Sequence, residues 1–158
     1  MSQLAAWEEG RAQALIAERA GLPGALLPIL HALQEHFGYV DPVAVPLVAE
    51  ALNLSRAEVH GVVTFYHDFR QTPPGRHVLR VCRAEACQSM GADRLAGHIK
   101  ARLGIDFHQT SPDGRVTLEP VFCLGNCACS PAIMVDNELY GRVTPQRFDA
   151  ILSQWEKR

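Results

Sequence analysis

The sequence has no apolar run long enough to cross a membrane and no block of basic residues. A membrane-spanning helix needs about 18 apolar residues, a length that no stretch approaches. Acidic and basic residues are interspersed and the formal net charge is -2, so a nucleic-acid backbone would meet no basic surface. Residues 1–4 also lack the start of a secretory signal. We expect a cytoplasmic protein that binds no nucleic acid and does not insert into a membrane.

Cysteine is missing from the N-terminal part of the chain. The first 70 residues contain none, and all five cysteines follow position 80. Residues 71–75, with two prolines and a glycine, predict a boundary between two domains at 1–72 and 76–158. An odd number of cysteines argues against a simple disulfide framework. In the cytosol, clustered cysteines more often bind metal or perform redox chemistry.

The N-terminal domain is predicted to be a helical bundle. Residues 3–20 show a helical pattern of polar and apolar side chains, and further helices are predicted at 23–36 and 41–52. Ser55 and Glu58 have the spacing of a capping box, in which each side chain bonds a free amide of the other residue. A fourth helix is therefore expected to begin after Ser55.

The C-terminal domain alternates strands and helices, which predicts a small α/β sandwich. The segment 77–82 is apolar enough for a buried strand, and 90–103 repeats leucine and isoleucine with helical spacing. The remaining expected elements are strands at 116–122, 133–135 and 139–140 and a helix that follows Thr144-Pro145.

Two cysteine pairs carry the chemistry of this domain. Cys82 and Cys87 follow one predicted strand, and Cys123 and Cys127 follow another, with 35 residues between the pairs. If the two strands are neighbours, their ends lie about 5–10 Å apart. The two loops could then enclose one inorganic centre, and four thiolates are what a [2Fe–2S] cluster requires.

Two other kinds of site remain open at this stage. Four cysteines in two pairs also suit a structural zinc ion in an interaction module, although zinc pairs are usually tighter and closer in sequence. A thiol oxidoreductase would need a C-x-x-C motif with a reactive thiol, and the chain has none.

Other residues near the pairs have less defined roles. Gly91 and Gly125 lie at the loops, and Arg83 is a basic group that could offset an anionic cluster. Cys129 is a fifth cysteine, which could be a thiol behind the ligands, a substitute ligand or a small buried side chain. We favour the last two interpretations over a direct ligand, because four ligands complete a cluster.

Three segments together resemble a known family, the thioredoxin-like [2Fe–2S] ferredoxins, and in particular the small iron–sulfur subunit of NADH dehydrogenase (complex I) and its relatives. The segments are residues 58–66, 81–87 and 121–127. The resemblance extends from about residue 22 to the end. It implies a helical N-terminal region, a thioredoxin-like [2Fe–2S] ferredoxin domain, and cluster ligation by Cys82, Cys87, Cys123 and Cys127.

The resemblance also implies a non-catalytic electron-transfer subunit that exchanges single electrons with a flavin- and NAD-binding diaphorase subunit. The chain itself is expected to bind neither NAD nor formate, and it lacks a G-x-G-x-x-G motif after a strand. His60 and His67 lie beside the aromatic residues Phe65, Tyr66 and Phe69. These side chains form either ordinary packing or a docking face for the flavin subunit.

The family has branches in complex I, in the diaphorase of NAD-linked hydrogenases, and in the gamma subunit of NAD-dependent molybdenum formate dehydrogenase. The run Ala-Cys-Ser-Pro-Ala at residues 128–132 is most similar to the formate dehydrogenase branch. That similarity implies a molybdenum-containing catalytic subunit as a second partner.

Overall fold

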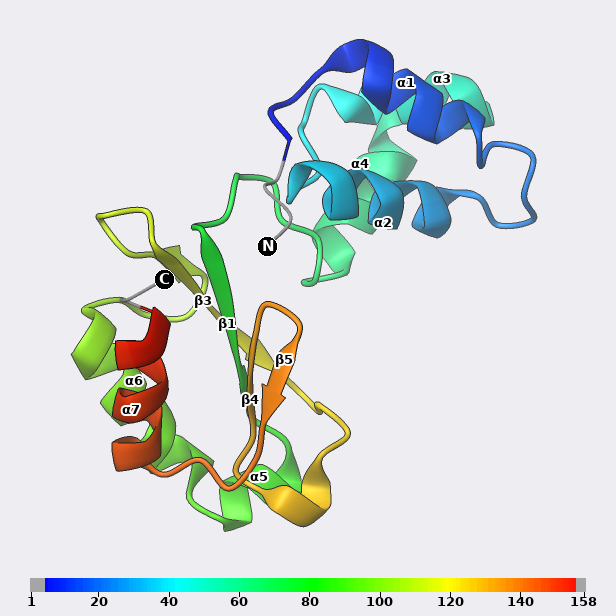
Figure 1. Cartoon of the computed structure of the whole chain (residues 1–158). Coiled ribbons are helices and arrows are strands. Elements are labelled where there is room, and N and C mark those ends of the chain that lie inside the picture. Colours follow the sequence, from blue (N-terminus) through cyan, green and yellow to red (C-terminus); the bar gives the residue numbers. More distant parts are fainter. Residues whose placement is uncertain (1–4, 156–158) are drawn as a thin grey trace. The chain divides into compact units, whose positions relative to one another are not determined.

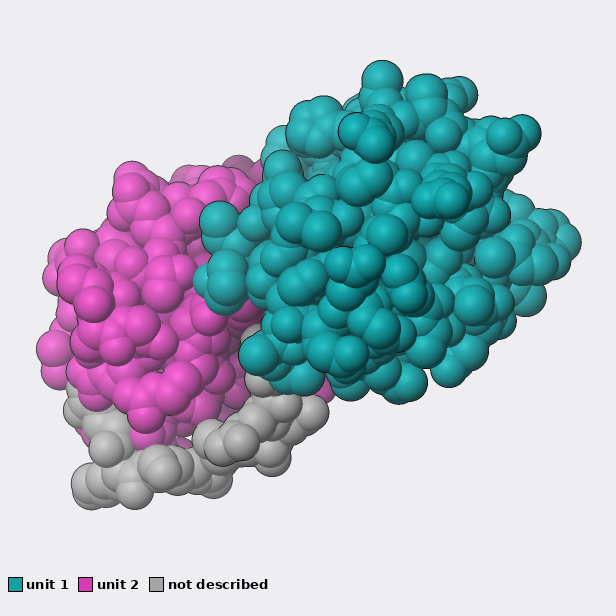
Figure 2. Space-filling view, turned by 90° about the horizontal axis from the view of Figure 1, so that it is seen from above, with its two compact units in different colours: residues 1–73 teal, residues 74–158 magenta. Residues whose placement is uncertain are grey.

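The computed structural model describes residues 5–155, and the chain divides between Pro73 and Pro74 into two compact units, which Figure 2 shows in different colours. Figure 1 shows helices throughout the first unit and a sheet with helices in the second. None of the helices in residues 5–155 combines the length and apolar character that a membrane crossing requires.

The described part of the first unit contains four helices, which enclose two small apolar cores. They are α1 (Glu9–Ala17), α2 (Leu26–Phe37), α3 (Ala44–Leu52) and α4 (Arg56–Phe65). On α2, Ile29, Leu33 and Phe37 recur every four residues and are buried, which is why this helix packs along one face.

Local hydrogen bonds explain where two of these helices begin. Ser55 Oγ accepts from the Glu58 amide, and the Glu58 carboxylate accepts from the Ser55 amide, so the predicted capping box is confirmed. The helix expected at 41–52 begins later, at Ala44, because Asp41 Oδ1 accepts from the Val43 amide and forms a turn first. The helix predicted at 3–20 is shorter, and residues 3 and 4 lie outside the described part.

The second unit is built on a five-stranded sheet with the strand order β2-β3-β1-β4-β5. The strands are β1 (His77–Cys82), β2 (Gln109–Thr110), β3 (Val116–Val121), β4 (Ile133–Val135) and β5 (Glu138–Tyr140). β1 and β3 are parallel neighbours, whereas the other pairings are antiparallel. The C-terminal ends of β1 and β3 therefore reach the same edge of the sheet.

One face of this sheet is covered by two helices. Leu79 on β1 pairs with Leu118 on β3 and Val135 on β4, and all three pack in one apolar core. Side chains of α6 (Ala92–Leu103) and α7 (Pro145–Trp155) complete that core, and the two helices lie side by side (Figure 1). Alternation along β1 directs Arg80 to the other face.

The predicted helices and strands of this unit are present, with two additions. The loop between β1 and α6 contains a short helix, α5 (Glu85–Ser89), and β2 extends the sheet beyond β3. The expected cap of the last helix is confirmed, because Thr144 Oγ1 accepts from the Arg147 amide at 3.2 Å.

Candidate functional site

The two cysteine loops start at adjacent strand ends. Cys82 is the last residue of β1 and stands opposite Val121, the last residue of β3. Cys123 follows only two residues beyond Val121. The parallel pairing of two strands, which are separated by more than thirty residues in sequence, therefore brings both loops to one edge.

The first loop holds its cysteines inside the protein. Cys82 and Cys87 are 3% and 2% exposed, and they pack with Ala92 and Ala132. α5 positions Cys87 by turning the chain back over the end of β1. Small side chains around the two sulfurs leave them enclosed by apolar surface.

The second loop leaves its cysteines at the surface. Cys123 and Cys127 are exposed, and their sulfurs lie 4.0 Å apart. Gly125 adopts a φ of 72°, which suits glycine, and its amide donates to Cys123 Sγ at 3.2 Å. Cys127 begins a short 3-10 turn, η1 (Cys127–Cys129). The backbone of this loop thus already directs an N–H group at a sulfur.

Burial and hydrogen bonding shift the thiol pKa values of Cys82 and Cys87 in opposite directions. Burial raises the pKa of the Cys82 thiol, and hydrogen bonds from the amides of Ala84 and Leu124 offset part of that effect. Burial also acts to raise the pKa of Cys87, but hydrogen bonds, chiefly with Ser130 and Cys82, outweigh it and lower that pKa. The pKa values of the two buried thiols are therefore shifted in opposite directions.

The two pairs also influence one another. The pKa of Cys127 is raised, first by its hydrogen bond with Cys123, then by the charges of Cys123 and Cys87 and by burial. Leu124, in the second loop, directs its amide at Cys82 in the first. These two contacts run between the loops that contain the four predicted cysteines.

The donor set suits a binuclear cluster. Within the described residues, no three His, Cys, Asp or Glu side chains are placed to hold a single metal ion. The thiols are arranged instead as two pairs, one on each loop, and two pairs match a cluster in which each iron takes two thiolates. The backbone amides aimed at Cys82 and Cys123 would hydrogen-bond charged ligand sulfurs.

Ser130 is a site residue for which sequence reasoning gave no role. Its hydroxyl lies 3.5 Å from Cys87 Sγ and donates to the Cys127 carbonyl at 2.7 Å. Ser130 is 43 residues from Cys87 in sequence, and no local pattern signals that contact. Only the pairing of β1 with β4 brings the two residues together.

Arg83 and Cys129, the other candidates in this region, are both engaged by neighbours. Arg83 does not point freely at the site, because its guanidinium pairs with Asp93 at 2.8 Å and lies 5.4 Å from the centre of the Phe107 ring. The charge of Arg83 is thus partly neutralised. Cys129 is half-buried, and its carbonyl accepts from the Arg142 amide at 2.6 Å.

Exposed apolar side chains border the cysteine loops. Phe122, beside Cys123, is 77% exposed, and Met90, just after α5, is 63% exposed. The two side chains add apolar surface beside the cysteine loops.

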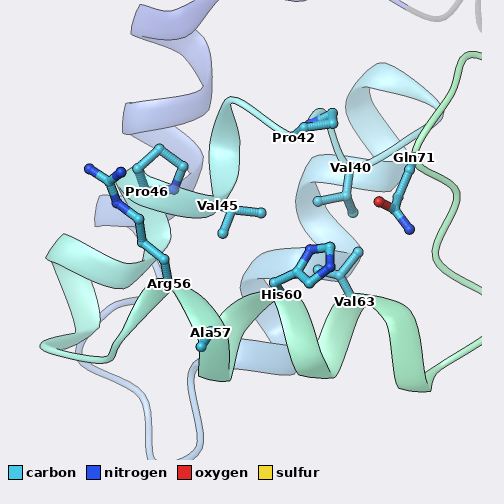
Figure 3. Close-up of a pocket in the computed structure, with 9 residues that line it drawn as sticks. All are labelled: Val40, Pro42, Val45, Pro46, Arg56, Ala57, His60, Val63 and Gln71. Atoms are coloured by element: carbon cyan, nitrogen blue, oxygen red, sulfur yellow. The ribbon is translucent and has the colours of Figure 1, made fainter.

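The first unit has a separate hollow, a cavity of about 400 Å³ between the segment leading into α3 and helix α4 (Figure 3). His60 and Val63 of α4 line it, together with Val40 and Pro42. On the same helix, Phe65 is 72% exposed. Its ring contacts the Tyr66 ring at a centroid distance of 5.1 Å, whereas Phe69 is buried.

Comparison with known proteins points to a single family. The model of the thioredoxin-like [2Fe-2S] ferredoxin family matches residues 12–156. An NADH-quinone oxidoreductase subunit of Pseudomonas aeruginosa is 39% identical over 131 residues, which cover 83% of this chain and 79% of the relative. The HndA subunit of the NADP-reducing hydrogenase of Solidesulfovibrio fructosivorans is 37% identical over 132 residues, which cover 84% of this chain and 77% of the relative.

A solved structure with a similar fold belongs to a much larger chain. An NAD+-reducing [NiFe]-hydrogenase, in its air-oxidized state, aligns with a TM-score of 0.71 and 26% identity. The alignment covers 88% of this chain but only 24% of the hydrogenase chain. This chain therefore corresponds to about a quarter of that one.

Proposed function

Because the chain belongs to the thioredoxin-like [2Fe-2S] ferredoxin family, we propose that it is an electron-transfer subunit whose cluster is held by Cys82, Cys87, Cys123 and Cys127. The observation that carries this ligand assignment is the pairing of β1 with β3, which places both cysteine pairs at one edge of the sheet. Two contacts between the loops support it: the Leu124 amide of the second loop hydrogen-bonds Cys82 of the first, and the charge of Cys87 helps to raise the pKa of Cys127.

When bound, the [2Fe–2S] cluster supplies a site that accepts and releases one electron. The chain supplies two different sides to that site. Cys82 and Cys87 shield one side from water, and amides aimed at the sulfurs stabilise negative charge. Cys123 and Cys127 form the exposed side, where a partner can approach.

The partner on that exposed side is a flavin- and NAD-binding diaphorase subunit. Relatives of the chain are subunits of an NADH-quinone oxidoreductase and of an NADP-reducing hydrogenase, and both names describe nicotinamide chemistry. The exposed Phe122 and Met90 provide apolar surface next to the cysteines, as interface cores often do. Such a subunit works in the cytoplasm and makes or breaks no bond itself.

The proposed complex is an NAD-dependent formate dehydrogenase with a molybdenum-containing catalytic subunit. The run Ala-Cys-Ser-Pro-Ala at residues 128–132 supports this choice. Complex I and an NAD-linked hydrogenase are the alternatives, and the named relatives are subunits of an NADH-quinone oxidoreductase and of an NADP-reducing hydrogenase. Purification of the native complex distinguishes the three, because only the formate dehydrogenase contains molybdenum and reduces NAD with formate.

Electron paramagnetic resonance of the anaerobically prepared full chain tests the cluster itself. We expect a half-spin signal after dithionite reduction, none before it, and about two iron and two sulfide per chain. A colourless chain that binds about one zinc and stays silent after reconstitution would overturn the electron-transfer function.

A further inference from the structure

A single buried hydroxyl group connects the two cysteine loops. Ser130 is 7% exposed, and its Oγ lies 3.5 Å from Cys87 Sγ and 2.7 Å from the Cys127 carbonyl oxygen. Cys87 belongs to the buried side of the site and Cys127 to the exposed side. Ser130 therefore contacts one cysteine of each pair.

The hydrogen-bond pattern around Ser130 depends on the proton of Cys87. As a thiol, Cys87 donates to Ser130 Oγ, and the Ser130 hydroxyl donates to the Cys127 carbonyl. As a metal-bound thiolate, Cys87 has no proton and can only accept. The hydroxyl of Ser130 then faces two acceptors with one proton, and a charged sulfur is a stronger acceptor than a neutral carbonyl.

The competing acceptor can be satisfied in another way. Cys127 lies in the exposed loop and its carbonyl hydrogen bond with Ser130 is only partly buried, so water has a route to that oxygen when the serine hydroxyl turns away. Cys87 is 2% exposed, so water cannot replace the hydroxyl at its sulfur. Solvent access thus also favours donation from Ser130 to Cys87.

We propose that Ser130 is a positioning residue of the cluster site, whose hydroxyl hydrogen-bonds the Cys87 thiolate and raises the reduction potential of the bound cluster. The inference rests on the proposed function, because it concerns a ligand of that cluster. Reduction adds negative charge, part of which resides on the ligand sulfurs. A donor to a ligand sulfur stabilises the reduced form more than the oxidised form.

Three variants of the full chain test this role in a potentiometric titration followed by electron paramagnetic resonance. Ser130→Ala removes the hydroxyl, Ser130→Thr retains it, and Ser89→Ala removes a serine hydroxyl that bonds the Ala86 carbonyl in α5 instead. At the wild-type midpoint, we expect the reduced-to-oxidised ratio of Ser130→Ala to fall at least threefold. That change corresponds to about 28 mV at 59 mV per tenfold change. Ser130→Thr and Ser89→Ala should stay at the wild-type value.

A second measurement applies even if Ser130→Ala fails to hold the cluster. Electron–nuclear double resonance on the reduced wild-type chain in D2O should detect a rapidly exchanging deuteron in addition to that of the exposed Gly125 amide at Cys123, because the Ser130 hydroxyl exchanges faster than a buried amide. Ser130→Thr should retain this signal. An unchanged midpoint in Ser130→Ala, or the absence of the rapidly exchanging deuteron in the wild type, would overturn the role of Ser130. A wild-type chain that binds no cluster would refute the proposed function itself.

Discussion

Replacing Gly141 by alanine should destabilise the C-terminal unit and displace the turn that carries Cys127. An added Cβ would lie 2.7 Å from Asn126 Nδ2, 2.7 Å from Cys129 Cβ and 2.8 Å from the Cys129 carbonyl oxygen. The Asn126 side chain can rotate away, but Cys129 belongs to η1 and moves only with it. Overpacking of this kind costs about 1–3 kcal/mol.

The backbone at Gly141 cannot easily move away from Cys129, because hydrogen bonds hold this segment in place. Its carbonyl accepts from Arg147 Nη1 at 2.7 Å. The next amide, of Arg142, donates to the Cys129 carbonyl at 2.6 Å. The strain therefore has to be relieved by η1, which begins at Cys127.

Thermal unfolding of the reduced full chain, followed by circular dichroism, measures the cost. For a unit of this size, 1 kcal/mol corresponds to about 4–8 °C, so a cost of about 1–3 kcal/mol in Gly141→Ala should lower Tm by about 4–24 °C. Gly97→Ala is the matched control, since an added Cβ there meets nothing within 4 Å and Gly97 lies within α6. The control should gain about 0.5–1 kcal/mol from better helix propensity. If Gly141→Ala melts at or above the wild-type temperature, the steric argument is wrong.

Further substitutions test the fold and the site separately. Leu79→Ala, at a fully buried position of β1, should lower the free energy of unfolding by about 2–5 kcal/mol, measured by urea unfolding. A decrease of less than about 1 kcal/mol would contradict the packing of the core. Ser55→Ala should lower the free energy of unfolding by about 1 kcal/mol, because α4 loses its N-terminal cap. An unchanged midpoint of urea unfolding would show that the capping box does not contribute to stability. Hydrogen bonds to Glu58, chiefly from the Ser55 amide and then from the Ser55 hydroxyl, hold the pKa of Glu58 below its ordinary value of 4.5. The contribution of Glu58 to the stability of the fold is therefore present above pH 4.5 and is lost as the pH falls below it. The stability difference between wild type and Glu58→Gln should therefore narrow in acid, and a constant difference would refute that pKa direction. Cys127→Ser should lose the visible absorption of the cluster and Cys129→Ser should keep most of it; equal losses would refute the ligand assignment.

Local sequence patterns predicted most of the helices and strands, but not all of their limits. The capping box at Ser55 and the cap at Thr144 depend on residues three apart, so sequence alone was sufficient for both. The predicted start at 41 was wrong because a turn at Asp41 competes with the first helical hydrogen bonds. The helix predicted at 3–20 begins only at Glu9, because Glu8 is extended. The short helix α5 lacks a complete helical period of apolar residues, and no pattern predicted it.

At the candidate site, the spacing of the cysteines predicted two loops but not their different environments. Nothing in the segment 82–87 or 123–127 indicates that the first pair is buried and the second exposed. That difference arises because α5 folds Cys87 against Ala132, whereas the second loop leaves the sheet after Val121. Exposure depends on which distant segments cover a residue, and sequence spacing carries no such information.

The sequence by itself determined the thiol chemistry, the strands that precede each cysteine pair, and the family to which the chain belongs. Three features are visible only in the tertiary structure. They are the pairing of β1 with β3, the contact of Ser130 with Cys87, and the ion pair of Arg83 with Asp93. The physical reason is the range of the interactions. Helical periods, caps and loop spacings depend on interactions over a few residues. The contact between Ser130 and Cys87 joins residues that are 43 positions apart, and it exists only once the sheet has formed.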